Sequence, residues 1–353
     1  MSLSAEVFRD REFIRTGENL YFCVVDDIHP LDRVISYLRY APSAEGKWGR
    51  GGQRFARAMP TYSIPNLLRN IDYLKTMYPD YVFRSDVFGV EMSAVPLNRV
   101  AQHYLPQVKM REISEMERPD SLQRKVVDLV DYISDATGVD QDVFGVTGSI
   151  LIDLHNPEFS DIDLTISGGA NGLHIKKMLP TLYSEAEGLV KSIPKPLLKR
   201  WYEDKVKTHP LSLDEAKDLR RRQWNYNSFR GTVFSIHTVR ALSEIREKYG
   251  DKHFHSVGIV TGRAVISDAS ESLFNPHIYE VEDFKVDEGM KVEDILEVST
   301  YSGLFGGVFE EGEAILVHGK LELVEDTRSG DVYHRIVIGS PEAGGHDYIK
   351  PIS

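Results

Sequence analysis

The pattern of apolar and polar positions divides the chain into three regions that differ in the helices and strands they predict. Residues 1–115 mix short strands with helices. The apolar stretches at Phe13-Ile14 and Leu20 to Val25 flank a turn and predict a hairpin. Apolar residues at helical spacing predict a helix over residues 31–40. Residues 45–57 are Gly-rich and basic, which predicts a loop that could also serve as a flap for phosphate or an acceptor.

The second region, residues 116–252, alternates helical patterns with apolar strands, which favours a mixed sheet. The expected elements, in chain order, are a helix over Leu122 to Ala136 capped by Asp120 or Ser121 and stopped by Gly138, a strand from Val143 to Val146, a short helix opening at Gly148-Ser149, a strand from Ile162 to Ile166, a helix near Leu213 to Asn225, a strand from Thr232 to Val239 and a helix from Ala241 to Tyr249.

The third region, residues 253–353, is β-rich. Four long runs alternate apolar and polar residues between Gly, Asp and Asn turns, and residues 327–330 predict a hairpin turn. This pattern predicts a small closed or partly open β-barrel, with an OB-like form among the candidates. The expected fold class is therefore α/β (α+β) in three domains: an N-terminal α+β domain (1–115), a mixed-sheet core (116–252) and a C-terminal barrel (253–353).

The stretch that carries chemistry is residues 145–166. A buried strand ends at Gly148-Ser149, where a helix starts and unpaired backbone N–H groups can meet an anion. Asp161 and Asp163 follow on a strand and share one face, because strand side chains alternate. Two carboxylates forced together are stabilised by a divalent cation, and hard oxygen ligands beside a phosphate site suit Mg²⁺ or Mn²⁺. Ser160, directly before the pair, joins Gly148 and Ser149 as a candidate nucleotide-binding residue.

This stretch resembles the signature of the DNA polymerase beta nucleotidyltransferase superfamily: a Gly-Ser turn, a spacer of about ten residues, and Asp-x-Asp on a strand. The resemblance implies that Gly148 and Ser149 hold nucleotide phosphates and that Asp161 and Asp163 bind the catalytic metals. The whole chain also resembles an archaeal family of predicted nucleotidyltransferases of unsettled substrate, through His29-Pro30 with the residues after it and the GVTGS run.

The sequence departs from the superfamily pattern at the third carboxylate, which is expected on the strand Thr232 to Val239. That strand contains no Asp or Glu, and Ser235 and His237 share one of its faces. His237 could replace the missing acid as a base or a metal ligand, or it could be structural. In the first case its ring should point toward the aspartates, and metal affinity should fall as the pH drops through its titration. Glu280 and Glu282 could reach the site from the barrel, although such alternating positions are more typical of a surface.

Residues 191–230 are the basic part of an acidic chain, with 11 Lys and Arg against 5 Asp and Glu in a protein of net charge −12. Arg220 and Arg221 lie there together and could clamp a triphosphate, or they could belong to a solvated helix face. The overall negative charge argues against strong general affinity for duplex DNA.

The sequence contains no apolar run long enough to span a membrane and no apolar secretory segment, and Cys23 is its only cysteine. These features favour a cytoplasmic protein without membrane partners.

Together these observations predict a metal-dependent nucleotidyltransferase that uses an NTP and an acceptor hydroxyl of unknown identity, RNA being one candidate. Two other functions stay open. One is a nucleotide- or RNA-binding module that keeps the fold without catalysis, and the other is a structural or assembly protein.

Overall fold

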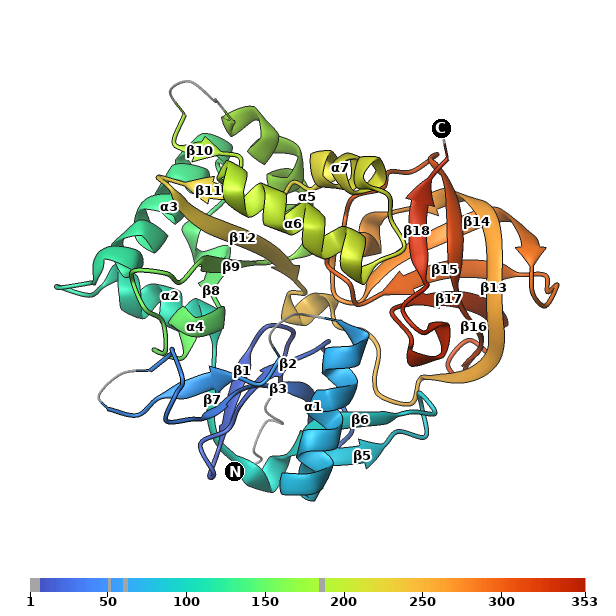
Figure 1. Ribbon diagram of the computed structural model, residues 1–353, viewed down its shortest axis with the longest axis horizontal. Helices are drawn as coiled ribbons and strands as arrows, with labels where there is room; N and C mark the ends of the chain where they lie inside the picture. Colours follow the sequence, from blue (N-terminus) through green and yellow to red (C-terminus); the bar gives the residue numbers. More distant parts are fainter. Residues whose placement is uncertain (1–6, 50–51, 60–62, 184–187, 353) are drawn as a thin grey trace.

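The computed structural model describes residues 7–49, 52–59, 63–183 and 188–352. In this part of the chain, three β-sheets come from three successive stretches of sequence, and seven α-helices accompany them (Figure 1). No helix among the described residues is long and apolar enough to cross a membrane. The protein is therefore of mixed α+β class, as its alternating patterns predict.

The first sheet has seven strands in the order β5-β6-β3-β2-β1-β7, with β4 paired to β3. The strands are β1 (Phe13–Thr16), β2 (Tyr21–Val24), β3 (Arg33–Pro42), β4 (Phe55–Arg57), β5 (Val82–Arg84), β6 (Glu91–Pro96) and β7 (Val100–Tyr104). Helix α1 (Ile64–Met77) covers this sheet with its buried Leu74 in the same apolar cluster. The antiparallel pairing of β1 with β2 confirms the predicted hairpin.

The helix predicted over residues 31–40 is wrong, because this segment forms most of strand β3. The strand lies in the interior of the sheet, paired with β2 on one side and β6 on the other. Val34 and Leu38 are buried on one face, and Ile35 is buried on the other, beside the half-buried Tyr37. Apolar residues on both faces hide the two-residue alternation that normally distinguishes a strand from a helix.

The middle sheet has the strand order β10-β11-β12-β9-β8. Its strands are β8 (Phe144–Val146), β9 (Ile162–Ser167), β10 (Val190–Lys191), β11 (Tyr226–Phe229) and β12 (Thr232–Val239). Its helices are α2 (Pro106–Ser114), α3 (Ser121–Thr137), α4 (Gly148–Leu151), α5 (Gly169–Met178), α6 (Lys195–Thr208) and α7 (Leu213–Arg222). The predicted elements between residues 120 and 239 are confirmed, with small shifts at their ends.

Helix α3 shows why these predictions hold. The Asp120 carboxylate accepts hydrogen bonds from the N–H groups of Leu122 and Gln123, both at 3.0 Å, and Gly138 ends the helix with a φ of +74°. Such caps satisfy backbone groups that the helix leaves unpaired, and each contributes on the order of 1 kcal/mol.

The helix predicted from Ala241 to Tyr249 is wrong, since only Leu242–Glu244 form a short 3-10 turn. The Glu244 carboxylate accepts hydrogen bonds from the N–H groups of Ala241, at 2.8 Å, and Gly169, at 3.0 Å. The following segment then runs along the first sheet, where the Tyr249 hydroxyl meets Ser85 Oγ at 2.5 Å. Contacts with distant parts of the chain override the local helical pattern here.

The third sheet comes from β13 (Lys252–Asp268), β14 (His277–Glu288), β15 (Ile295–Thr300), β16 (Ala314–Asp326), β17 (Val332–Ile338) and β18 (Tyr348–Pro351). Five of these strands pair around a ring in the order β13-β14-β15-β17-β16, and β16 pairs again with β13. The pairing of β15 with β17 is parallel and the others are antiparallel. The predicted strands and the hairpin turn at residues 327–330 are therefore present.

Candidate functional site

The candidate site lies on the face of the middle sheet that is turned away from helices α3 and α5. The apolar side chains of β9 are buried in the core that these helices share: Ile162, Leu164 and Ile166. Because strand side chains alternate, Asp163 points to the opposite face, and Asp161 directly precedes the strand. This register leaves the carboxylates on the side of the sheet that faces the N-terminal region.

The turn that opens α4 brings the main chain against Asp163. The Thr147 N–H donates to the Asp163 carbonyl at 2.8 Å, and Gly148 has a φ of +65°. A Cβ at Gly148 would overlap the Asp163 carboxylate oxygen Oδ2. Glycine therefore meets both the left-handed backbone and the lack of space. Ser149 follows as a buried residue, so the structure brings Gly148, Ser149 and Asp163 together.

The two aspartates are close enough to repel one another. Asp163 raises the pKa of Asp161 from its ordinary value to about 6, and burial adds to this effect. The guanidinium groups of Arg57 and Arg39 act in the opposite direction. A divalent cation would relieve the repulsion, and paired carboxylate oxygens are ligands that suit Mg²⁺.

The protein supplies only part of a coordination shell at this pair. Within the described ranges, no three His, Cys, Asp or Glu side chains are grouped so that they could hold a metal ion. A cation at Asp161 and Asp163 would therefore need oxygen ligands from water or from substrate phosphates, which is the usual situation for Mg²⁺.

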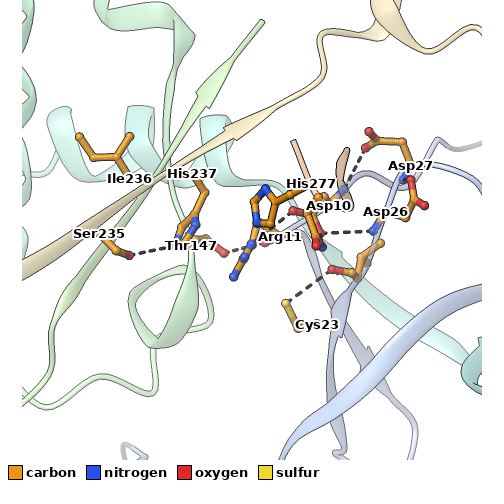
Figure 2. Close-up of polar contacts among 12 residues, drawn as sticks. Asp10, Arg11, Cys23, Asp26, Asp27, Thr147, Ser235, Ile236, His237 and His277 are labelled. Carbon is orange, nitrogen blue, oxygen red and sulfur yellow. Dashed lines mark hydrogen bonds and ion pairs between the residues drawn. The ribbon is translucent and has the colours of Figure 1, made fainter. Parts of the chain in front are cut away.

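Strand β12 places Ser235, rather than His237, beside the aspartates. β12 pairs parallel with β9, and Ser235 lies opposite Asp163 while His237 lies opposite Thr165. Ser235 Oγ donates to Asp163 Oδ1 at 2.5 Å, and His237 Nε2 lies 2.9 Å from the same hydroxyl. Ser235 thus occupies the position expected for a third carboxylate, and His237 reaches Asp163 through it. Figure 2 shows the contact between Ser235 and His237.

The expectation that His237 titrates beside the metal needs correction. Burial lowers its pKa well below the ordinary value, and the positive charge of Arg11 and the nearby His277 add to the effect. A neutral ring carries one N–H, and the Ser235 proton is used toward Asp163, so Nε2 of His237 is the donor to the hydroxyl. His237 therefore positions Ser235 and stays neutral in the pH range where it would otherwise titrate.

The other side of His237 faces a small cavity of about 20 Å³ where all three regions of the chain meet. Arg11 comes from the first region, His237 from the second and His277 from the third (Figure 2). Asn275 donates to Asp10 Oδ1 at 2.9 Å across the same junction. A cavity of this size can hold about one water molecule, so it is no binding site for a substrate.

The remaining candidate residues are spread more widely. Ser160 is buried, and its Oγ accepts a hydrogen bond from the Asn156 N–H at 2.9 Å, which fixes the loop before Asp161. Arg220 is buried and donates to the Tyr226 carbonyl at 2.7 Å. The Arg221 side chain is 73% exposed and pairs with Asp218 at 2.9 Å. Arg220 thus holds the main chain beside the site, whereas Arg221 points to solvent.

The two glutamates proposed as alternatives for the third acid, Glu280 and Glu282, do not lie beside the aspartates. Glu280 and Glu282 are exposed on β14, in the third sheet, where Glu280 lies opposite Glu297. Neither is among the main influences on the pKa of Asp161, which are Asp163, burial, Arg57 and Arg39. They are surface residues of the ring of strands.

Sequence reasoning missed the residues that other segments bring to the pair. Tyr226 on β11 lies near both aspartates: burial raises the pKa of its phenol, and Asp161 and Asp163 raise it further. Arg57 and Arg39 come from β4 and β3 of the first sheet. The one available signal was the basic, Gly-rich character of residues 45–57.

Comparison with known proteins places this chain beside an archaeal relative. An uncharacterized protein of Methanocaldococcus jannaschii is 29% identical over 346 residues, which cover 97% of this chain and 98% of that protein. No protein-family model matches the chain, and no solved structure matches it. The likeness runs through all three regions of the chain.

Proposed function

We propose that this protein is a metal-dependent nucleotidyltransferase that moves a nucleotidyl group from an NTP to an acceptor hydroxyl. The observation that carries the proposal is the close approach of the Gly148 turn to Asp163, with Asp161 beside it and β12 parallel to β9. This arrangement resembles the Gly-Ser turn and the paired aspartates of the DNA polymerase beta superfamily.

In the proposed reaction the acceptor oxygen bonds to the α-phosphorus of the NTP, the bond to the β-phosphate oxygen breaks, and pyrophosphate leaves while the acceptor proton passes to solvent. Bound Mg²⁺ or Mn²⁺ would neutralise charge on the phosphates and on the attacking and leaving oxygens. Asp161 and Asp163 would hold the metal, and the main chain at Gly148 and Ser149 would meet the phosphates. Ser235 orients Asp163 through its hydrogen bond.

A non-catalytic nucleotide-binding module is the second candidate, and Ser235 is the observation that favours it. A hydroxyl in register with Asp163 is a poorer metal ligand and a poorer base than a carboxylate. A site with two carboxylates would still bind a metal–nucleotide complex. Turnover separates the two candidates.

We further infer that the C-terminal ring of strands is a small OB-like barrel. Five strands close on themselves with one parallel pair, β15 with β17, which is the arrangement of a compact Greek-key barrel. Because OB-type barrels bind oligonucleotides, RNA is the first acceptor to test, ahead of a protein side chain or a small metabolite.

The experiment is incubation of the protein with each α-labelled NTP, Mg²⁺ or Mn²⁺, and RNA with a free 3′ hydroxyl, followed by detection of labelled acceptor and pyrophosphate. We expect metal-dependent transfer that is lost in Asp163→Ala. Metal-dependent NTP binding without pyrophosphate release would establish the binding module instead. Absence of NTP binding with any metal would exclude both.

A further inference from the structure

A cation from the N-terminal region lies beside the two aspartates. Arg57 ends strand β4, opposite Tyr40 of β3, and its guanidinium lies 4.6 Å from the centre of the Trp48 ring. The Trp48 ring is in turn edge-on to Phe159, with 6.1 Å between the ring centres. Phe159 is two residues before Asp161. This chain of contacts fixes Arg57 next to the segment that carries the metal-binding pair.

The loop that holds Trp48 is also attached through its backbone. The Gly49 N–H donates to the Leu154 carbonyl at 3.2 Å, and this hydrogen bond joins the Trp48 loop to the segment that follows α4. Phe55 and Leu154 lie in the same buried apolar cluster. The placement of Arg57 therefore depends on packing between the first and middle sheets.

Among the residues that the structure describes, Arg57 stacks on Trp48 but is paired with no anion. Its Nε is buried and has no hydrogen-bond partner in the part of the chain that the structure describes. No carboxylate among those residues forms an ion pair with it, although its charge lowers the pKa of Asp161. An unsatisfied buried donor is costly, and a planar guanidinium is well suited to phosphate oxygens.

We propose that Arg57 is the phosphate-binding cation of the site, which receives the triphosphate of an NTP whose metal is held by Asp161 and Asp163. This inference rests on the nucleotidyltransferase or nucleotide-binding function proposed above. It assigns phosphate binding to the N-terminal region and not to α7, where Arg220 is bonded to the main chain and Arg221 faces solvent.

The proposal predicts opposite effects of one substitution on two ligands. Arg57→Gln removes a positive charge near Asp161, so the affinity for Mn²⁺ alone should stay the same or increase. The same substitution removes a charge-assisted contact to phosphate, so the affinity for an Mn²⁺–NTP complex should fall about tenfold to a hundredfold. Arg57→Lys keeps the positive charge but lacks the planar set of N–H donors. Its affinity for the Mn²⁺–NTP complex should therefore fall less than that of Arg57→Gln.

The test is calorimetric titration of the full chain with Mn²⁺, with each NTP plus Mn²⁺, and with inorganic triphosphate plus Mn²⁺. Arg221→Gln, which removes an exposed arginine of α7, is the matched control and should bind as the wild type does. Circular dichroism melting checks that each variant is folded. If Arg57→Gln does not fold, Arg57→Lys replaces it in the titrations.

Normal NTP and triphosphate binding by folded Arg57→Gln, with binding retained by the wild type, would overturn the assignment of Arg57 and leave the proposed function standing. Loss of NTP binding in Arg221→Gln but not in Arg57→Gln would move the phosphate site to α7. A wild type that binds no NTP with Mn²⁺ would remove the function and this assignment together.

Discussion

Replacement of Asp161 by asparagine tests the repulsion between the two aspartates. The pKa of Asp161 rises from 3.8 to about 6 in the folded protein, chiefly because of Asp163. At about 1.36 kcal/mol per pKa unit, the folded state loses up to about 3 kcal/mol when Asp161 is charged. Because the folded-state pKa is the higher one, this loss is absent below about pH 4, grows as the pH rises to about 6, and stays constant above it.

Asp161→Asn should therefore raise the free energy of unfolding of the metal-free protein by up to about 3 kcal/mol near pH 7.5 and leave it unchanged near pH 4. The assay is urea unfolding in the presence of a chelator at both pH values. Added Mn²⁺ should raise the melting temperature of the wild type but much less that of the variant. Asp72→Asn, on the exposed face of α1, is the control and should show neither effect.

The opposite stability result would refute this reasoning. If Asp161→Asn lowers the stability of the metal-free protein near pH 7.5, the carboxylate stabilises the fold through a contact that outweighs its repulsion by Asp163. The pair would then be structural, and no metal would be needed to explain it.

Two further substitutions probe the surroundings of Asp163. Gly148→Ala places a Cβ against the carboxylate and strains a left-handed backbone, so stability should fall by about 1–3 kcal/mol and Mn²⁺ binding should weaken; unchanged urea unfolding would contradict the close contact. Ser235→Asp places a third carboxylate in register with Asp163, so Mn²⁺ affinity should rise about tenfold or more while the metal-free protein loses stability near pH 7.5. A drop in Mn²⁺ affinity, measured by titration, would show that this position cannot serve as a metal ligand.

Much of the middle sheet could be predicted from sequence because its signals are local. The cap at Asp120, the stop at Gly138 and the alternation around Asp163 each act within a few residues. The same holds for the Gly148 turn, whose glycine is required by the carboxylate that follows on the next strand. Such features can be predicted because they place particular residue types at fixed spacings in the sequence.

The rest of the site depends on contacts between distant segments, and such contacts produce no periodic pattern in the sequence. Arg57 lies 104 positions before Asp161 in the chain, and packing between distant segments, such as that of Trp48 against Phe159, brings it near. The sequence gives Ser235 only as one polar position of a strand. The parallel register of β12 with β9 is what places it opposite Asp163. The pattern of strand β3 predicts a helix because apolar residues stand on both of its faces and hide the alternation.

The charge balance at the site explains why a hydroxyl can stand where a third carboxylate is expected. Two carboxylates already raise the pKa of Asp161 to about 6, and a third would increase the repulsion further whenever no metal is bound. Ser235 orients Asp163 by donating a hydrogen bond and adds no charge. In the function proposed here, this arrangement would bind the bare cation more weakly, and the phosphate oxygens of a nucleotide would complete its coordination. Metal and nucleotide should then bind cooperatively. The cation would neutralise the aspartates, and the triphosphate would bring the missing metal ligands and a hydrogen-bond partner for Arg57, whose Nε has none among the described residues.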